Sequence, residues 1–401
     1  MTPPKDYTLD YEGKESEKHI IAETSSALVQ KLRAFDSHRK LQFDTTWSNM
    51  LIFGDNLPVL KLLLNDPNVK SQVRLIYIDP PFSTNHEFRG GDGRTSTISY
   101  SKKDRHAYED LLVGADYLEF LRKRLVLLRE LLAEDGSIYV HIDWKKGHYV
   151  KVLMDEIFGE SHFINDIARI KCNPKNFARR AYGNIKDMIL FYSKSNSYYW
   201  HESLEDYADE DVIRLFPKID KEGRRYTTNP LHAPGETING PTGRPWRGIS
   251  PPECRHWRCS PTVLDDLDGR GLIEWSSTNN PRKKIYAEDY IRKKKKRQDI
   301  WEFKDPPYPK YPTEKNIEMI KVIIDASSKP NDLVLDCFSG SGNTLVAAEN
   351  MDRRWIGIDN SLLATEVTLK TLLALKAYSA FSLYKSKEAL LSDAIQEILQ
   401  Q

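Results

Sequence analysis

Five short, nearly continuous apolar runs, each ending in an aspartate, constrain the fold of this chain more than any other feature of its sequence. The runs occupy residues 50–55, 74–79, 137–143, 332–336 and 354–359. Runs of this length are typical of strands buried on both faces of a mostly parallel sheet. Segments with apolar residues at helical spacing separate them, at 57–64, 117–132 and 345–349. The sequence therefore predicts an α/β fold whose sheet is completed from both ends of the chain.

Changes in composition along the chain predict its division into segments. Residues 1–44 are polar and of mixed charge, and we interpret them as an N-terminal extension with a short helix near 26–35. Residues 197–298 interleave tryptophan, tyrosine, proline and charged side chains with weak helical periodicity, which predicts an inserted module. The expected α/β domain and a C-terminal helix take up the remaining ranges, 45–196 with 299–380 and then 381–401.

The composition is that of a globular protein, with 40% hydrophobic and 29% charged residues. The sequence contains no run of 18 apolar residues and no basic segment leading into an apolar stretch at its start. We therefore expect neither a membrane span nor a signal peptide, and a cytoplasmic protein.

Four cysteines are too few for a disulfide scaffold. Cys254 and Cys259, with His256 between them, are poorly spaced for zinc and lack a second pair, so no metal site is expected.

The net charge is close to zero, with 59 basic and 58 acidic residues, so binding to a polyanion would depend on local clusters. One cluster, between residues 169 and 186, has no acid and consists of Arg169, Lys171, Lys175, Arg179, Arg180 and Lys186. A second, between residues 282 and 297, has nine basic residues against two acidic ones. Alone, a charge run is usually a solvated face, and a nucleic-acid context turns such clusters into candidate phosphate contacts.

A glycine-rich turn follows the apolar run at 332–336 and opens directly into a helix. Its sequence is Phe338-Ser339-Gly340-Ser341-Gly342, with Thr344 in the first turn of the helix. Such a turn lets a ligand approach the backbone, with free N–H groups at the start of the helix. The next strand ends in Asp359, where a carboxylate can accept hydrogen bonds from a ribose. This pairing favours a nucleoside ligand, and the lack of a Walker sequence argues against ATP or GTP.

A second loop, Asp79-Pro80-Pro81-Phe82, follows the run at 74–79, at the strand end where open α/β sheets bind ligands. Its two prolines stiffen the backbone, so the Asp79 carboxylate and the Pro80 carbonyl can converge as acceptors, with the ring of Phe82 beside them. An exocyclic amino group on a planar base fits these three groups. A rigid exit from a strand is the plainer alternative. The similar segment at 305–308 follows no long buried strand, and we reject it as the site.

In their order along the chain, these loops resemble those of S-adenosyl-L-methionine-dependent, site-specific amino-group DNA methyltransferases of the permuted β class, adenine-N6 type. In that family an Asp-Pro-Pro-aromatic motif precedes the target-recognition segment, and a Phe-x-Gly-x-Gly motif comes last. Further matching segments are Leu51–Leu60, with its Gly-Asp-Asn-Leu sequence, 122–143, Asp299-Ile-Trp301 and Tyr311-Pro-Thr-Glu-Lys315. The resemblance covers residues 48–196 and 240–365.

The resemblance implies a seven-stranded, mostly parallel, Rossmann-like sheet with helices on both faces and an inserted target-recognition module. It implies S-adenosyl-L-methionine as cofactor, with its methionine part at 338–342, its ribose at Asp359 and its adenine near Asp55. It also brings Thr313 and Lys315 toward the carboxylate end of the cofactor. The full set of cofactor-binding residues carried over by position is Asp55, Asn56, Asp79, Thr313, Lys315, Asp336, Phe338, Ser339, Gly340, Ser341, Gly342, Thr344 and Asp359.

The function that the resemblance implies is methyl transfer to the N6 amine of adenine in a specific double-stranded DNA sequence, by base flipping and without a metal. The catalytic residues would be Asp79, Pro80, Pro81 and Phe82. Two alternatives stay open: methylation of cytosine at N4, whose amine suits the same acceptors, and a catalytically silent nucleic-acid-binding protein of the same fold. Double-stranded DNA is the implied partner, with a homodimer and a cognate restriction endonuclease as further options.

Overall fold

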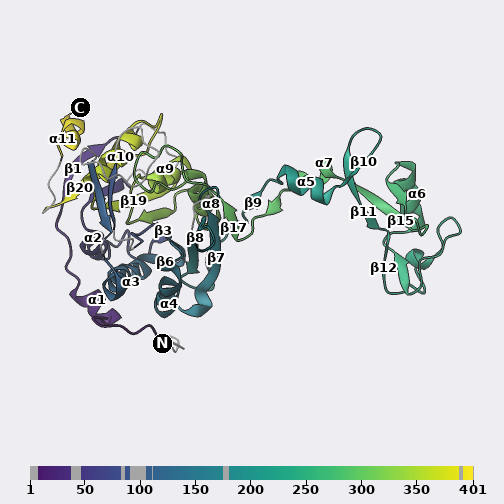
Figure 1. Cartoon of the computed structure of the whole chain (residues 1–401), viewed down its shortest axis with the longest axis horizontal. Coiled ribbons are helices and arrows are strands. Elements are labelled where there is room, and N and C mark those ends of the chain that lie inside the picture. Colours follow the sequence, from purple (N-terminus) through teal and green to yellow (C-terminus); the bar gives the residue numbers. More distant parts are fainter. Residues whose placement is uncertain are drawn as a thin grey trace. The chain divides into compact units, whose positions relative to one another are not determined.

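A computed structural model describes residues 8–37, 47–82, 86–90, 105–110, 112–174, 180–387 and 392–400. The chain folds as two compact units (Figure 1). Unit 1 comprises Met1–Glu202 and Gln298–Gln401, and unit 2 comprises Ser203–Arg297. Unit 2 thus falls within the range 197–298 that the composition sets apart. Among the described residues, no helix is both long enough and apolar enough to cross a membrane.

Ten strands form the main sheet of unit 1, in the order β1-β20-β2-β19-β18-β3-β6-β8-β7-β17. Six of the nine neighbouring pairs are parallel, and the antiparallel pairs are β1 with β20, β6 with β8 and β7 with β8. In sheet order, the strands are β1 (Val29–Phe35), β20 (Phe381–Ser386), β2 (Asn49–Phe53), β19 (Arg354–Asp359), β18 (Leu333–Asp336), β3 (Val73–Ile78), β6 (Leu132–Ile142), β8 (Lys186–Ser193), β7 (Phe163–Ile170) and β17 (Ile300–Glu302).

The sheet has three strands more than the seven expected, and all three lie at or beside an edge. β17 has only three residues, and only Trp301 among them is buried. β1 buries only its last residue, Phe35, which stacks on Phe381 of β20 with ring centroids 4.5 Å apart. Strands with so few buried residues leave no apolar run in the sequence. The prediction of a short helix near 26–35 is therefore wrong, because that segment contains β1.

The C-terminal segment also differs from the expectation of a helix over 381–401. Residues Phe381–Ser386 form β20, which pairs antiparallel with β1 and parallel with β2, and the helix that follows is α11 (Asp393–Gln400). Phe381 and Leu383 are fully buried. Apolar residues at every second position are typical of a strand. Here the strand forms by pairing with β1 and β2, which come from the other end of the chain.

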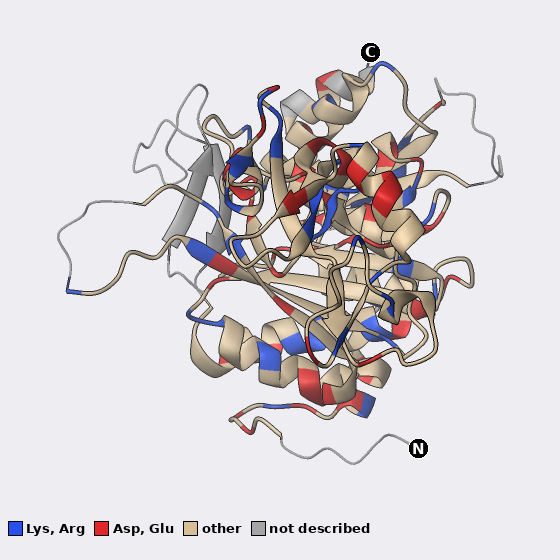
Figure 2. Ribbon diagram, turned by 90° about the vertical axis from the view of Figure 1, so that its right-hand side faces the viewer, with Lys and Arg blue, Asp and Glu red and all other residues tan. Residues whose placement is uncertain are grey.

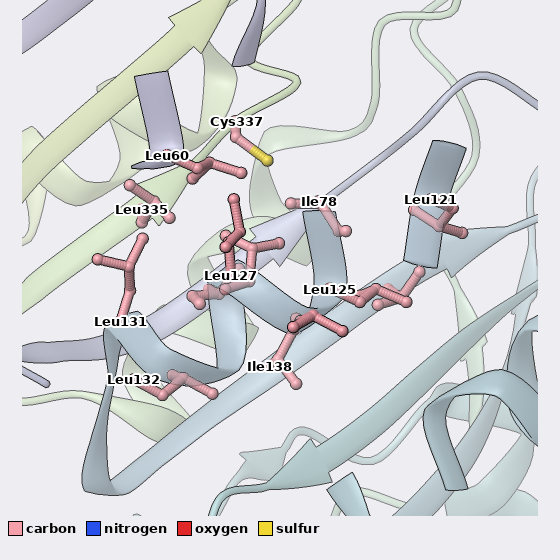
Figure 3. Close-up of a cluster of buried hydrophobic side chains, with 14 of the residues drawn as sticks. Leu60, Ile78, Leu121, Leu125, Leu127, Leu131, Leu132, Ile138, Leu335 and Cys337 are labelled. Atoms are coloured by element: carbon pink, nitrogen blue, oxygen red, sulfur yellow. The ribbon is translucent and has the colours of Figure 1, made fainter. Parts of the chain in front are cut away.

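Helices cover both faces of the sheet (Figure 1). One face is covered by α2 (Asn56–Leu63), α3 (Gly114–Leu131) and α4 (Gly147–Phe158), and the other by α8 (Ile317–Ser327), α9 (Asn343–Asn350) and α10 (Leu362–Leu373). Side chains of β3 alternate between the two resulting cores: Ile76 and Ile78 face α3, and Leu75 and Tyr77 face α8. Figure 3 shows the first core, where leucines of α3 pack against Ile78, Ile138 and Leu335.

The segment before β1 is tied to the outer surface of α3. It contains α1 (Glu17–Glu23), whose N-cap Ser16 accepts a hydrogen bond from the His19 N–H. Specific polar contacts join this segment to α3 and α4: Tyr11 to Glu119 at 2.7 Å, Lys14 to Glu156 at 2.8 Å and Arg129 to Glu17 at 2.9 Å. Unit 1 also contains the 3-10 helix η1 (Glu160–His162) and a two-stranded ribbon of β4 (His86–Gly90) and β5 (Arg105–Asp110).

Unit 2 is built of short elements around a small core of its own. Its four-stranded antiparallel sheet contains β10 (Lys218–Ile219), β11 (Arg225–Pro230), β15 (Pro281–Tyr286) and β14 (Ile273–Trp275). Two ribbons pair β12 (His232–Pro234) with β13 (Arg255–Trp257), and β9 (Leu204–Glu205) with β16 (Lys295–Lys296). The helices are α5 (Asp209–Leu215), η2 (Pro241–Gly243), α6 (Pro261–Gly269) and α7 (Ala287–Ile291). Trp246 and Trp257 are fully buried in the core, with Leu231 and Leu264.

Candidate functional site

Five aspartates lie at the carboxyl ends of five neighbouring parallel strands. In sheet order these are Asp55 after β2, Asp359 at the end of β19, Asp336 at the end of β18, Asp79 after β3 and Asp143 after β6. β18 pairs in parallel with both β19 and β3. The glycine-rich turn after β18 and the Asp-Pro-Pro-Phe loop after β3 therefore leave the same edge of the sheet side by side.

Hydrogen bonds from neighbouring elements hold the glycine-rich turn. Gly340 and Gly342 have left-handed backbones, with φ of 49° and 77°, which glycine adopts without strain. A Cβ at Gly342 would also lie 2.6 Å from the side chain of Thr368. The N–H groups of Gly340 and Ser361 donate to the two carboxylate oxygens of Asp359, each at 2.8 Å. The Gly340 amide is therefore already bonded to Asp359, whereas α9 itself begins at Asn343.

Two carboxyl groups at these strand ends, the buried Asp336 and the half-buried Asp359, have no cationic partner among the described residues. Burial, with a smaller contribution from the nearby Asp79 and Asp359, raises the pKa of Asp336 to about 7, against hydrogen bonds from Thr344 and the Phe338 N–H that lower it. Burial likewise raises the pKa of Asp359 to about 6, against hydrogen bonds from backbone N–H groups. Within the part of the chain that the structure describes, no lysine or arginine forms an ion pair with either aspartate. Bringing a positively charged ligand here would favour the ionised carboxylates.

In the Asp-Pro-Pro-Phe loop, the two oxygens of Asp79 differ in their surroundings. Oδ2 forms an ion pair with Nζ of Lys315 at 2.5 Å. Oδ1 is buried, and no group among the described residues donates a hydrogen bond to it. Nζ of Lys315 also lies 5.2 Å from the centroid of the Phe82 ring, within range of a cation–π interaction. Pro80 is buried, and Pro81 and Phe82 are half-buried. Asp79 therefore has one oxygen fixed by Lys315 and one still able to accept.

Lys315 comes from a segment that also contacts the glycine-rich turn. Its Nζ donates to the Thr313 carbonyl at 2.9 Å, and its own carbonyl accepts from the side chain of Asn343, the first residue of α9, at 2.8 Å. The same Asn343 amide donates to the Glu314 carboxylate at 3.0 Å. The ring of Tyr311 lies 3.5 Å from where a Cβ of Gly340 would be. In this structure the ammonium of Lys315 binds Asp79, and its expected approach to the cofactor's carboxylate stays a prediction.

Arg124 of α3 orients the two residues that follow β2. Its Nη2 donates to Asp55 at 3.0 Å and its Nε donates to the Asn56 side-chain oxygen at 2.5 Å. The Asn56 amide in turn donates to the carbonyl of Cys337, in the turn after β18, at 2.6 Å. The guanidinium lies 3.6 Å from the ring centroid of Phe120. Arg124 thus links α3 directly to the start of α2, and Asn56 continues the link to the turn after β18.

A buried polar group lies behind the Asp-Pro-Pro-Phe loop. Nδ1 of His141 on β6 is 3.0 Å from the Tyr77 hydroxyl, and Nε2 is 3.4 Å from Asp187 on β8. The His141 ring centroid lies 6.2 Å from that of Phe82. Burial lowers the pKa of His141. Burial would by itself raise the pKa of Asp187, but hydrogen bonds and charge from His141 and Lys171 hold it well below its usual range.

Part of the basic cluster at 169–186 is structural. Arg169 is fully buried and donates to the Phe303 carbonyl at 2.8 Å and to Asp305 at 2.5 Å. Lys171 pairs with Asp187 at 2.7 Å. These contacts also occupy Asp305, the aspartate of the rejected Asp-Pro-Pro-Tyr segment, which follows the edge strand β17. Arg180 and Lys186 are exposed, and Lys175 and Arg179 lie outside the described residues.

The structure gathers most of the predicted residues around these strand ends, and adds others. Among the predicted set, the buried side chains are Asn56, Pro80, Lys315, Asp336, Ser339, Ser341 and Thr344. Thr313 has a left-handed backbone, with φ of 61°. Sequence reasoning missed Arg124 and gave His141 no role. The available signal was a basic residue inside the apolar stripe of α3, and a histidine inside the apolar run of β6.

The chain is similar to known DNA methyltransferases over most of its length. A sequence model of the DNA methylase family (N6_N4_Mtase) matches residues 73–369. The type II methyltransferase M.EcaI of Enterobacter cloacae is 41% identical over 369 residues, which cover 90% of this chain and 77% of that protein. The Mod subunit of the type III restriction-modification enzyme EcoP15I of Escherichia coli is 25% identical over 420 residues, covering 87% of this chain and 62% of the subunit. Among solved structures, the M1.HpyAVI–SAM complex aligns with 80% of this chain and all of that chain, at 17% identity and a TM-score of 0.41.

The extent of these sequence matches decides the family. The matched region begins at β3, before the Asp-Pro-Pro-Phe loop, and ends within α10, beyond the glycine-rich turn. It therefore contains both loops and the whole of unit 2. By this match and by its identity with M.EcaI, the chain belongs to the DNA methylase family.

Proposed function

We propose that this chain transfers a methyl group from S-adenosyl-L-methionine to the N6 amine of adenine in a specific sequence of double-stranded DNA. The observation that carries the proposal is the parallel pairing of β3 with β18, which brings the Asp-Pro-Pro-Phe loop beside the glycine-rich turn. Family membership supports the reaction class. The order of the two motifs, with unit 2 between them, supports assignment to the permuted β class.

The residues at the strand ends fit S-adenosyl-L-methionine, which when bound supplies an electrophilic methyl group on a sulfonium centre. The raised pKa values of Asp336 and Asp359 favour a ligand with positive charge. Each oxygen of Asp359 keeps a second lone pair for a ribose hydroxyl, besides the N–H bond that it accepts. Ser339 Oγ is buried and has no partner among the described residues, so it is available to a polar group of the cofactor. We assign the adenine end to Asp55 and Asn56, which Arg124 holds in place.

Asp79, Pro80 and Phe82 are proposed to hold the target base. Oδ1 of Asp79 and the Pro80 carbonyl accept the two N–H bonds of the amine, so that its nitrogen becomes pyramidal and its lone pair points away from both acceptors. Phe82 stacks on the base, and its own ring lies near both Lys315 and His141. Lys315 keeps the second oxygen of Asp79 in place. Such fixed positioning supplies much of the rate in a transfer that needs no covalent enzyme intermediate.

Unit 2 is the proposed target-recognition module. Adenine N6 is paired within a duplex, so the base must leave the stack to reach Asp79, at a cost of a few kcal/mol. Contacts to bases and phosphates around the site offset this cost. The EcoP15I Mod subunit is named as part of a restriction-modification enzyme. By extension, we propose a cognate restriction endonuclease as a functional partner, and we retain a homodimer as the proposed assembly.

The proposal is tested by methylating plasmid DNA in vitro and digesting it to nucleosides for mass spectrometry. We expect N6-methyladenine from the wild-type chain. Asp79→Ala should lower its formation by at least about a hundredfold, the usual effect of removing one preorganised polar group, with cofactor binding retained. Asp305→Asn is the control, because it changes the aspartate of the other Asp-Pro-Pro segment but keeps an oxygen that can accept from the buried Arg169, and it should stay within a few-fold of wild type. Full activity in Asp79→Ala would refute the assignment.

The same experiment separates the alternatives. N4-methylcytosine in the digest would identify the chain as a cytosine methyltransferase, whose target amine suits the same two acceptors. A wild-type chain that binds duplex DNA but neither binds S-adenosyl-L-methionine in calorimetry nor yields a methylated base would be a silent DNA-binding protein. Sequencing host DNA for modified bases, with and without the gene, would then identify the recognised sequence.

A further inference from the structure

Many cations of unit 2 are paired with carboxylates. The pairs include Arg214 with Asp211 at 2.7 Å, Arg224 with Asp220 at 2.9 Å, Arg247 with Asp265 at 3.0 Å, Arg270 with Asp266 at 3.3 Å, Lys294 with Asp206 at 3.3 Å, Lys295 with Asp211 at 2.6 Å and Arg297 with Glu205 at 2.7 Å. Figure 2 shows the resulting mixture of acidic and basic residues along the ribbon. Three cations of the basic run at 292–297 are therefore already neutralised locally, which weakens that run as a phosphate site.

A second group of cations surrounds His232, where β11 leads into the β12–β13 ribbon. We define the His232 patch as His232, Arg255, Arg258 and Arg282. Arg255 and Arg258 are exposed, and Arg282 and His232 are half-buried. Across the described residues of unit 2, none of the three guanidiniums forms an ion pair with a carboxylate. Their recorded polar partners are neutral: Arg255 contacts the imidazole of His232, and Arg258 and Arg282 bind backbone carbonyls or a hydroxyl.

The geometry of the His232 patch is set by hydrogen bonds. Nη1 of Arg255 is 3.2 Å from Nδ1 of His232. Nε of Arg258 donates to the Pro230 carbonyl at 3.1 Å, and Arg282 donates to the carbonyl and hydroxyl of Thr228 at 2.7 and 2.8 Å. Each guanidinium has five N–H bonds, so several donors on every arginine are left for a ligand. The patch is thus ordered before any ligand arrives.

The three positive charges reinforce one another around His232. Burial lowers the pKa of His232, and Arg255, Arg258 and Arg282 lower it further, with no carboxylate acting in the opposite direction. The imidazole is therefore neutral near pH 7 and can accept the hydrogen bond from Arg255. The core residue Trp257 lies between two of the arginines in sequence and is fully buried, which anchors β13 beneath the patch.

We propose that the His232 patch binds the phosphate backbone of duplex DNA. This inference rests on the proposed function, which requires a DNA-binding surface on this chain, and it adds where that surface lies. Planar guanidiniums with free N–H pairs match the oxygens of a phosphate in two-point contacts. A phosphate contact releases counterions from the DNA, which favours binding. An arginine that must first break an ion pair with a carboxylate gains less from such a contact than an arginine without a carboxylate partner. The His232 patch is therefore a better phosphate site than the longer basic run at 292–297.

The test compares Arg255→Gln/Arg258→Gln with Arg214→Gln/Arg270→Gln. Both double variants remove two exposed arginines from unit 2, but only the second pair comes from ion pairs. Binding to a labelled, mixed-sequence duplex is followed by fluorescence anisotropy at several salt concentrations. For the patch variant we expect affinity about tenfold weaker at low salt, and a log–log salt slope shallower by about 2, the value for two lost phosphate contacts. The control variant should keep the wild-type slope.

Two further measurements keep the outcomes distinct. Thermal melting and S-adenosyl-L-methionine binding should match wild type in both variants, because the patch lies in unit 2 and the cofactor residues lie in unit 1. If the wild-type chain methylates DNA but the patch variant has the wild-type affinity and slope, the patch is not the phosphate site, and the proposed function stands. If the wild-type chain neither binds nor methylates DNA, the proposed function fails, and this inference fails with it.

Discussion

At the scale of single residues, the ion pair between Lys315 and Asp79 decides which oxygen of the carboxylate can accept the amine that we propose as the target. Lys315 occupies Oδ2 at 2.5 Å and leaves Oδ1 buried with no donor among the described residues. Lys315 does not have to touch the amine to matter, because it acts through Asp79 and through the Phe82 ring 5.2 Å away. It is therefore a positioning residue.

Lys315→Met should lower kcat much more than it changes the KM for either substrate. The carboxylate and the ring would lose their shared anchor, and a displacement of about 1 Å costs on the order of a hundredfold in rate. Lys315→Arg keeps the charge and should recover part of the loss. Lys310→Met removes an exposed lysine from the same loop and serves as the control. Equal activity of Lys315→Met and Lys310→Met in steady-state kinetics would contradict the assigned role.

At the scale of elements, the two glycines of the turn between β18 and α9 differ in why they are needed. Both have positive φ, which costs an L-residue about 1–2 kcal/mol. A Cβ at Gly342 would also meet Thr368 of α10 at 2.6 Å, whereas a Cβ at Gly340 would meet only Tyr311 at 3.5 Å, an ordinary contact. Gly342 is thus required by packing as well as by backbone conformation.

Gly342→Ala should therefore destabilise the fold and weaken cofactor binding more than Gly340→Ala. We expect Gly340→Ala to cost about 1–2 kcal/mol from backbone strain alone, and Gly342→Ala to exceed this, because α9 and α10 must separate locally. Denaturant unfolding and calorimetry with S-adenosyl-L-methionine measure the two effects. If Gly340→Ala lowered the stability more than Gly342→Ala, the side chain of Thr368 would be able to move away from the added Cβ.

The elements that the sequence predicts well are those that bury both faces. β2, β3, β18 and β19 each match an apolar run, because every position of such a strand must be apolar. β1 escapes prediction because it is an edge strand with one buried residue, and β20 because only its first three residues are buried and a polar serine lies among them. The contacts made by Lys315 and Arg124 escape it for another reason: each joins segments that come together only in the folded sheet. Motifs and strand ends were therefore predictable, and the side chains that orient them were not.

At the scale of the whole molecule, the buried aspartates link folding stability to pH. The folded-state pKa of Asp336, about 7, lies above its unfolded value of about 4. Between these values the folded chain holds a proton that the unfolded chain has lost. The associated stability is fully present below about pH 4 and is lost as the pH rises to about 7. Asp359, with a folded-state pKa of about 6, acts in the same direction.

S-adenosyl-L-methionine should therefore raise the Tm more at pH 8 than at pH 5.5. At the higher pH both aspartates must be ionised within the fold, and the positive charge of the ligand offsets a penalty of a few kcal/mol. Differential scanning fluorimetry at both pH values measures the shift. Asp336→Asn should flatten the pH dependence of the apo chain. An identical ligand shift at both pH values would mean that these carboxyl groups do not sense the bound cation.

The pairing of β1 with β20 has a consequence for the architecture of the gene. The Lys387 N–H donates to the Leu28 carbonyl at 2.9 Å. The start of β1 and the end of β20, which are the first and last strands of the sheet along the chain, therefore lie next to each other. A short peptide joining these two points would close the chain between them into a circle, and new termini could then be placed in a surface loop. A circular permutant could then have the glycine-rich turn before the Asp-Pro-Pro-Phe loop in its sequence and keep the same strand order in the sheet.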